Sequence, residues 1–330
     1  MNALIIGLGG VGQRHLRNIL EICPDTEFLS VRKRGRNYEI LDDLTIDDSV
    51  DIMEKYKIRN FQNINEAIEA SPDIAVVATP SVSHATICAE LLEKGIKVLV
   101  EKPAATTSSD YNSLIGLANL NNLHVVHQLR YHSCFIKLKE ILESGTMGKV
   151  NGVEISVRSH MPSWHKYENY EDLYAARKDQ GGGVILTEIH EIDLLCFLFG
   201  TAEVKYAQES NILNLQVEDT IVAICEFDYL QEKFLANLRL SFCQLPQDRH
   251  FIVYCDKGTL EWRLNGGLTM SDDSGENLFK PSENSRNELF IKLTQDFING
   301  SNDKLKTCSF FKSKEGLACA LKIKDSLNKS

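Results

Sequence analysis

The stretch NALIIGLGGVGQRHLRNIL, residues 2–20, decides the fold of the N-terminal part of the chain. A short apolar run leads into Gly7, Gly9 and Gly12 in G-x-G-x-x-G spacing, and a helical apolar pattern follows. In such a motif the first glycine permits a tight turn, the second lets backbone approach a pyrophosphate, and the third lets the helix lie close to the strand. The helix start adds N–H groups and the positive end of a dipole. The stretch therefore predicts a dinucleotide site, with a glycine turn that holds no ligand as the alternative. The cofactor-binding residues predicted at this turn are Gly7, Gly9, Gly10, Val11 and Gly12.

A basic run follows the second predicted strand, in TEFLSVRKRGR, residues 26–36. An acidic residue about 20 positions after the last glycine grips the adenosine ribose in NAD-binding sheets. Here that position is Arg32, followed by Lys33 and Arg34. A guanidinium pairs with a 2′-phosphate that a carboxylate would repel. The run predicts NADP in preference to NAD, with Arg32, Lys33 and Arg34 as contacts; a solvated basic loop is the alternative.

Strands and helices alternate through the rest of the first third. DIAVVATP, IKVLVEKP and LHVVHQLR have the apolar composition of buried parallel strands. We expect a doubly wound parallel sheet, whose ligands lie at the carboxyl ends of its strands. Two segments fall at such ends, residues 79–84 and residues 101–103. They add Thr79, Pro80, His84, Glu101 and Lys102 to the predicted cofactor-binding residues.

Lys102 stands out among the lysines because an apolar strand precedes it and a proline follows it. Proline restricts its own φ and biases the preceding residue to extended backbone. The backbone conformation of this lysine, and with it the direction of its side chain, is therefore restricted. A positioned lysine can exchange a proton with a hydroxyl group.

The stretch GGGVILTEIHEID, residues 181–193, places a histidine after three glycines. Glycine has no side chain to pack, so the triplet predicts a backbone that passes close to a ligand. Read as one helix, the segment carries Thr187, His190 and Leu194 on one face, with Asp193 beside it. The residues alone leave open an acid/base role for His190 or a hydrogen-bonded core histidine.

Four segments occur in the order seen in the glucose–fructose oxidoreductase/inositol dehydrogenase (Gfo/Idh/MocA) family. They are GLGGVGQRHLRNI, VVATPSVSHATICAELLEKGIKVLVEKPAA, RYH…LKEILESGTMGKV and GGGVILTEIHEID. The chain resembles this family densely over roughly its first 200 residues and loosely over the remainder. The resemblance implies a Rossmann domain at 1–125 and, at 126–330, an α/β domain with an open, mostly antiparallel sheet that often makes homo-oligomer contacts.

The resemblance also implies a chemistry, namely reversible hydride transfer between NAD(P) and a secondary alcohol of a sugar, inositol or nucleotide sugar. The lysine of the family's glutamate–lysine–proline motif matches Lys102, which binds substrate and transfers a proton, and its acid/base histidine matches His190. Thr187 stands where many members carry an aspartate, and a threonine can hydrogen-bond a substrate but carries no charge. This departure keeps a second hypothesis open, a non-catalytic NAD(P)-binding redox sensor or assembly partner.

An aromatic and basic segment, residues 161–180, lies between the first strand of the second domain and the glycine triplet. Aromatic faces stack on sugars or bases, and an arginine can meet a carboxylate or phosphate. We expect an anionic sugar or nucleotide sugar as substrate, and the alternative is an ordinary loop packed by its own aromatics. The predicted substrate-binding residues are Lys102, Arg130, Trp164, Tyr174, Arg177, Asp193 and His190.

The composition excludes several other classes of protein. The net charge of −10 argues against nucleic-acid binding, and no apolar run approaches the roughly 20 residues of a membrane span. Nine cysteines form no C-x-x-C pair, and no histidine spacing fits a metal site. The N-terminus lacks the features of a signal peptide. We expect a reduced, cytoplasmic protein without a metal.

Overall fold

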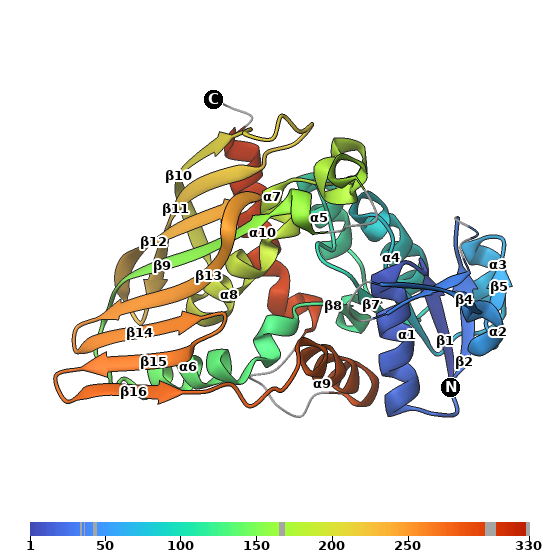
Figure 1. Cartoon of the computed structure of the whole chain (residues 1–330), viewed down its shortest axis with the longest axis horizontal. Helices are drawn as coiled ribbons and strands as arrows, with labels where there is room; N and C mark the ends of the chain where they lie inside the picture. The colour runs from blue at the N-terminus through green and yellow to red at the C-terminus, as the bar shows by residue number, and fades with distance from the viewer. Residues whose placement is uncertain (34, 36, 42–44, 165–168, 301–307, 328–330) are drawn as a thin grey trace. The chain divides into compact units, whose positions relative to one another are not determined.

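The computed structural model describes residues 1–33, 35, 37–41, 45–164, 169–300 and 308–327 (Figure 1). The chain forms two compact units. The first comprises Met1–Val126 and Phe290–Lys312, and the second comprises His127–Leu289 and Ser313–Ser330.

The first unit contains a parallel six-stranded sheet in the order β5-β2-β1-β6-β7-β8. Its strands are β1 (Asn2–Ile6), β2 (Glu27–Val31), β5 (Arg59–Phe61), β6 (Ile74–Val77), β7 (Lys97–Val100) and β8 (Leu123–Val125). The helices between them are α1 (Gly10–Ile22), α3 (Ile64–Glu69), α4 (His84–Glu93) and α5 (Ser108–Ile115). Every residue of β6 is buried, as expected for a parallel strand with both faces covered. The doubly wound sheet predicted from the sequence is confirmed.

A hairpin that the sequence did not indicate follows β2. It consists of β3 (Tyr38–Ile40) and β4 (Ile46–Asp51), and the short helix α2 (Ile52–Lys55) comes next. The buried side chain of Gln13 connects this hairpin to α1. Its amide nitrogen donates to the carbonyl oxygens of Leu8 and Tyr38, and its amide oxygen accepts from the N–H of Ile40. The glycine turn and the hairpin are therefore joined by one side chain.

A segment near the C-terminus belongs to the first unit, although the sequence placed it in the second domain, 126–330. Phe290, in α9 (Arg286–Asn299), contacts the ring of His15 and lies under the guanidinium of Arg14. Further along, the N–H of Val125 donates to the carbonyl of Cys308 at 2.7 Å. These contacts join residues far apart in the chain, so local sequence patterns carry no signal for them.

The second unit contains an eight-stranded sheet in the order β10-β11-β12-β9-β13-β14-β15-β16, seen side by side in Figure 1. All neighbouring strands are antiparallel except β12 and β9, which are parallel. This is the mostly antiparallel sheet predicted from the sequence. Its strands are β9 (Val150–His160), β10 (Ala202–Ser210), β11 (Thr220–Tyr229), β12 (Glu232–Ser241), β13 (Cys243–Cys255), β14 (Gly258–Arg263), β15 (Gly267–Asp272) and β16 (Gly275–Phe279).

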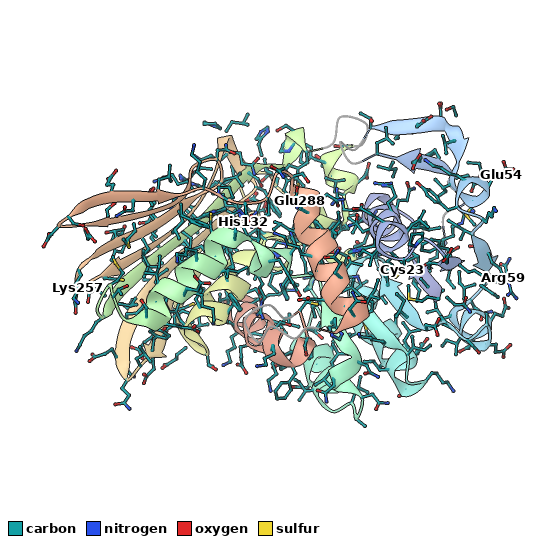
Figure 2. The ribbon with its side chains drawn as sticks, turned by 90° about the horizontal axis from the view of Figure 1, so that it is seen from below. Cys23, Glu54, Arg59, His132, Lys257 and Glu288 are labelled. Carbon is teal, nitrogen blue, oxygen red and sulfur yellow. The ribbon has the colours of Figure 1, made fainter. Side chains whose placement is uncertain are left out.

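Helices cover one face of this sheet (Figure 1). They are α6 (Ser133–Ser144), α7 (Val184–Thr187), α8 (Ile189–Phe199) and α10 (Phe310–Leu327). Figure 2 shows His132 at the start of α6, where its ring meets Phe135 and Trp262, and Lys257 at the turn between β13 and β14. Residues in β12 alternate between buried and exposed, because successive side chains point to opposite faces.

No disulfide joins the nine cysteines, all of which lie in the described ranges, and most of them are buried. Within the described ranges, no helix is both long enough and apolar enough to cross a membrane.

Candidate functional site

The glycine turn after β1 has two crowded glycines and one open glycine. A Cβ atom on Gly7, whose φ is +95°, would lie 2.5 Å from the carbonyl oxygen of Ala78, and one on Gly12 would strike the carbonyl of Gly7. A Cβ on Gly9 would meet no atom within 4 Å. Gly9 is also the N-cap of α1 and supplies no side-chain cap, so the helix start presents N–H groups to open space. A pyrophosphate fits this arrangement, as the sequence predicts.

The ends of β6 and β7 lie next to each other because the two strands pair in parallel. Thr79 and Pro80 follow β6, and Glu101 and Lys102 follow β7. His84 joins the two ends, with Nε2 at 2.8 Å from the carbonyl oxygen of Thr79 and Nδ1 at 2.8 Å from that of Pro103.

His84 was predicted to bind the cofactor, but both of its ring nitrogens face protein carbonyls. Burial lowers the pKa of this imidazole below its ordinary value, although the two carbonyl oxygens favour the charged form. The ring of His84 thus lies between the two loops, one of which carries Lys102, and in its neutral form it donates to one of the two carbonyl oxygens. Its contact with the cofactor stays a prediction.

Glu101 has a partner that the sequence analysis missed. His15, in the interior of α1, has Nε2 at 2.8 Å from Oε1 of Glu101. Burial alone raises the pKa of Glu101, but the hydrogen bond and charge of His15, together with Lys102, outweigh it and hold the pKa below its ordinary value. His15 comes three residues after Gly12, on the buried side of α1, and that spacing is the signal that could have found it.

Arg32 follows β2 directly, and two successive hydrogen bonds between side chains connect it to Asn37 and Asp51. Its Nη2 donates to Oδ1 of Asn37, whose amide nitrogen donates to Asp51. Lys33 is exposed beside it. Arg34, the third basic residue predicted to bind the cofactor, lies outside the described residues.

The predicted single helix after the glycine triplet is in fact two helices. The backbone of Glu188, with φ −99° and ψ 33°, separates α7 from α8. Thr187 therefore ends one helix while His190 lies in the first turn of the next, and the expected common face of Thr187, His190 and Leu194 is interrupted. Both Thr187 and His190 are buried.

His190 pairs with Gln128, which the sequence analysis did not single out. The amide nitrogen of Gln128 lies 3.2 Å from Nε2 of His190. An amide can donate through its nitrogen or accept through its oxygen, so Gln128 can follow Nε2 in either protonation state. His127 packs its ring edge against the same imidazole, with centroids 6.1 Å apart.

Arg130 and Asp193 were predicted to bind substrate, which stays a prediction, and the structure pairs them with each other. Nε and Nη2 of Arg130 donate to the two carboxylate oxygens of Asp193 at 2.8 and 2.7 Å. Both side chains are almost fully buried, and Nδ1 of His127 lies 3.4 Å from Asp193. The two parallel hydrogen bonds have the bidentate geometry that is favourable for arginine–carboxylate pairs. They connect residues 127–130 to α8.

Two glycines of the triplet, Gly182 and Gly183, pack closely against other parts of the chain. A Cβ on Gly182 would lie 2.5 Å from the carbonyl oxygens of Tyr174 and Ala175, and one on Gly183 would strike the carboxylate of Glu218. Oε1 of Glu218 also accepts from the N–H of Ile185 at 3.3 Å. Gly182 and Gly183 therefore lack side chains because the chain itself fills the space where a Cβ would lie, and the close approach of this backbone to a ligand stays a prediction.

Two carboxylates near this helix pair, the buried Glu191 and the half-buried Glu218, have shifted pKa values. Burial raises the pKa of Glu218 above its ordinary value. Burial likewise raises that of Glu191, against the opposing charge of Arg249, and Glu188 adds to the increase. Neither Glu218 nor Arg249 was singled out from the sequence, because their partners are distant along the chain.

The aromatic segment is partly exposed. Trp164 packs edge-on against Phe242, with centroids 5.1 Å apart, while Tyr174 keeps an exposed surface. Arg177 forms an ion pair with Asp179 at 2.8 Å. Residues 165–168 lie outside the described residues. In the described part of the chain, no group of histidine, cysteine, aspartate or glutamate side chains could hold a metal ion.

The parallel sheet and the open glycine turn define a dinucleotide-binding protein of the Rossmann class. The chain belongs to the Gfo/Idh/MocA oxidoreductase family: residues 1–128 match the family's NAD-binding Rossmann domain, and residues 135–261 match its C-terminal domain. The prediction made from the sequence is confirmed at this level.

Several enzymes are similar to this chain in sequence or in fold. Inositol 2-dehydrogenase of Salmonella typhimurium is 24% identical over 79% of this chain and 73% of its own length. Glucose-6-phosphate 3-dehydrogenase of Bacillus subtilis is 23% identical over 76% of this chain and 70% of its own. The WlbA dehydrogenase from Bordetella pertussis, solved in complex with NADH and UDP-GlcNAcA, shares the fold with a TM-score of 0.76 at 20% identity, over 99% of this chain and 96% of that one.

Proposed function

We propose that the chain catalyses reversible hydride transfer between NAD(P) and a secondary alcohol or ketone of a sugar, an inositol or a nucleotide sugar. The observation that carries the proposal is the open space at Gly9 before an uncapped helix, in a chain of this oxidoreductase family. The names of its relatives support the substrate class. Two of these relatives are named for an inositol and for a sugar phosphate, and WlbA was solved with a nucleotide sugar.

The chain's own side chains would handle the hydroxyl proton, while the nicotinamide supplies the hydride acceptor or donor. His190, whose Nε2 lies 3.2 Å from the amide nitrogen of Gln128, would exchange the proton. Lys102 would hold the reacting oxygen or share in the transfer, from a loop that His84 anchors through the carbonyl of Pro103. In this proposal Thr187 adds a hydrogen bond to the substrate and no charge.

NADP is the cofactor that we propose for this site, because a guanidinium stands directly after β2 where NAD-binding sheets carry a carboxylate. The Arg32→Asp variant should lose affinity for NADPH by about tenfold or more, which is about 1.4 kcal/mol, and lose little for NADH. Titration followed by fluorescence of the reduced cofactor measures both, with the exposed Arg59→Asp variant as control. Equal losses for the two cofactors would remove the basis for NADP preference.

A substrate panel tests the reaction itself. Purified protein with each oxidised cofactor and with sugars, inositols, sugar phosphates and nucleotide sugars should form reduced nicotinamide, measured by its absorbance. Tight cofactor binding without turnover of any of these compounds would favour the redox-sensor hypothesis.

A further inference from the structure

A second buried ion pair lies on α8, beside the residues already described. Nε of Arg249, in β13, donates to Oε1 of Glu191 at 2.6 Å. Arg249 has the same parity in β13 as Phe251 and Val253, which are fully buried, so it points to the helix-covered face of the sheet. The side chain of Glu191 is 2% exposed and that of Arg249 is 14% exposed.

The two ion pairs of α8 differ in how completely they are satisfied. Arg130 donates two parallel hydrogen bonds to the carboxylate of Asp193. Arg249 uses only Nε, and both its Nη2 and Oε2 of Glu191 are buried atoms with no hydrogen-bond partner among the described residues. A buried polar atom left without a partner carries a desolvation cost, and the cost is larger for charged groups. This ion pair therefore has one donor, Nη2 of Arg249, and one acceptor, Oε2 of Glu191, that could each form a further hydrogen bond.

The charges select the kind of group that fits. An anion would be attracted by Arg249 but repelled by Glu191, and Glu188 acts on both in the same sense as Glu191. A cation would be attracted by Glu191 but repelled by Arg249. A hydroxyl group accepts one hydrogen bond and donates another, so it satisfies Nη2 and Oε2 together without adding charge.

We propose that Arg249 and Glu191 form a binding site for one hydroxyl group of a polyol substrate and determine specificity for it. This inference rests on the proposed function. Glu191 directly follows His190 in the first turn of α8, and successive side chains of an α-helix point about 100° apart, so the site would recognise a hydroxyl other than the one that His190 serves. A site built to hydrogen-bond a hydroxyl discriminates strongly against an analogue that lacks it, because its own polar atoms are then left unpaired.

Calorimetric titration of the dinucleotide-loaded protein with myo-inositol and its monodeoxy analogues tests the site. The wild-type protein should bind one monodeoxy analogue at least about tenfold more weakly than myo-inositol. The Arg249→Met variant should lose that discrimination, because its affinity for myo-inositol falls while its affinity for the same analogue stays within about twofold. The exposed Arg263→Gln variant is the control and should behave as wild type. Equal weakening for myo-inositol and every analogue, or no weakening, would overturn the proposal.

A thermal measurement decides the question independently of the substrate. The Arg249→Met/Glu191→Met double variant removes an incompletely satisfied ion pair, so its Tm should equal or exceed that of wild type. A fall of more than about 3 °C would show that the pair stabilises the fold, and would overturn the proposal. If wild-type protein binds neither myo-inositol, glucose 6-phosphate nor UDP-N-acetylglucosamine, the proposed function fails, and the thermal result still decides whether this pair contributes to stability.

Discussion

Two clusters of glycine precede helices in this chain, and they serve opposite physical purposes. At the first, Gly9 faces open space at the start of α1. At the second, Gly182 and Gly183 face the carbonyls of Tyr174 and Ala175 and the carboxylate of Glu218. The first cluster leaves room for a ligand, whereas the second lets the chain fill its own interior. A missing side chain in the sequence does not by itself say whether the space is kept empty or filled.

The largest expected effect is on stability and comes from the second cluster. In Gly182→Ala the new Cβ would lie 2.5 Å from two backbone carbonyl oxygens, which cannot rotate away. We expect a loss of about 3 kcal/mol or more in the free energy of unfolding. Urea unfolding followed by circular dichroism measures it. A near-native stability would show that the 174–176 loop yields easily and that the triplet is not tightly packed.

The matched substitution in the first cluster, Gly9→Ala, should act on binding instead. Its methyl group meets no protein atom, and its φ of −75° suits alanine, so we expect a stability change below about 1 kcal/mol. The dissociation constant of NADPH should rise about tenfold or more, because the methyl occupies the space where a pyrophosphate approaches the backbone. Cofactor fluorescence reports the binding. Unchanged affinity in a stable variant would contradict the distinction between the two clusters.

A smaller effect should appear in the pH dependence of stability. Since burial raises the folded-state pKa of Glu218, its contribution is fully present below the unfolded-state pKa and is lost as pH rises through the folded pKa. Glu218→Gln keeps an oxygen for the N–H of Ile185 without a charge. Its Tm relative to wild type should therefore be higher at about pH 8 than at about pH 5. A difference that does not change with pH would mean that Glu218 is ionised without penalty.

Local patterns predicted the first unit well because its signals are short in sequence. The glycine turn, α1 and the apolar strands β6 and β7 each follow from fewer than about 20 neighbouring residues. The pairs that shape the candidate site join distant positions: His15 with Glu101 across 86 residues, Gln128 with His190 across 62, and Arg249 with Glu191 across 58. Such partners depend on strand order and register, so Arg130 and Asp193 could be named as polar residues of the site but not recognised as partners of each other.

The most direct test of the central claim is the kcat of wild type, Lys102→Met and His190→Ala, with a compound that wild type turns over. Lys94→Met, a substitution at an exposed lysine, is the control. If Lys102 and His190 handle the hydroxyl proton, kcat should fall by about 10² to 10⁴-fold in both variants and remain unchanged in the control, while NADPH binding persists. A variant at either position that retains wild-type kcat would contradict the assignment.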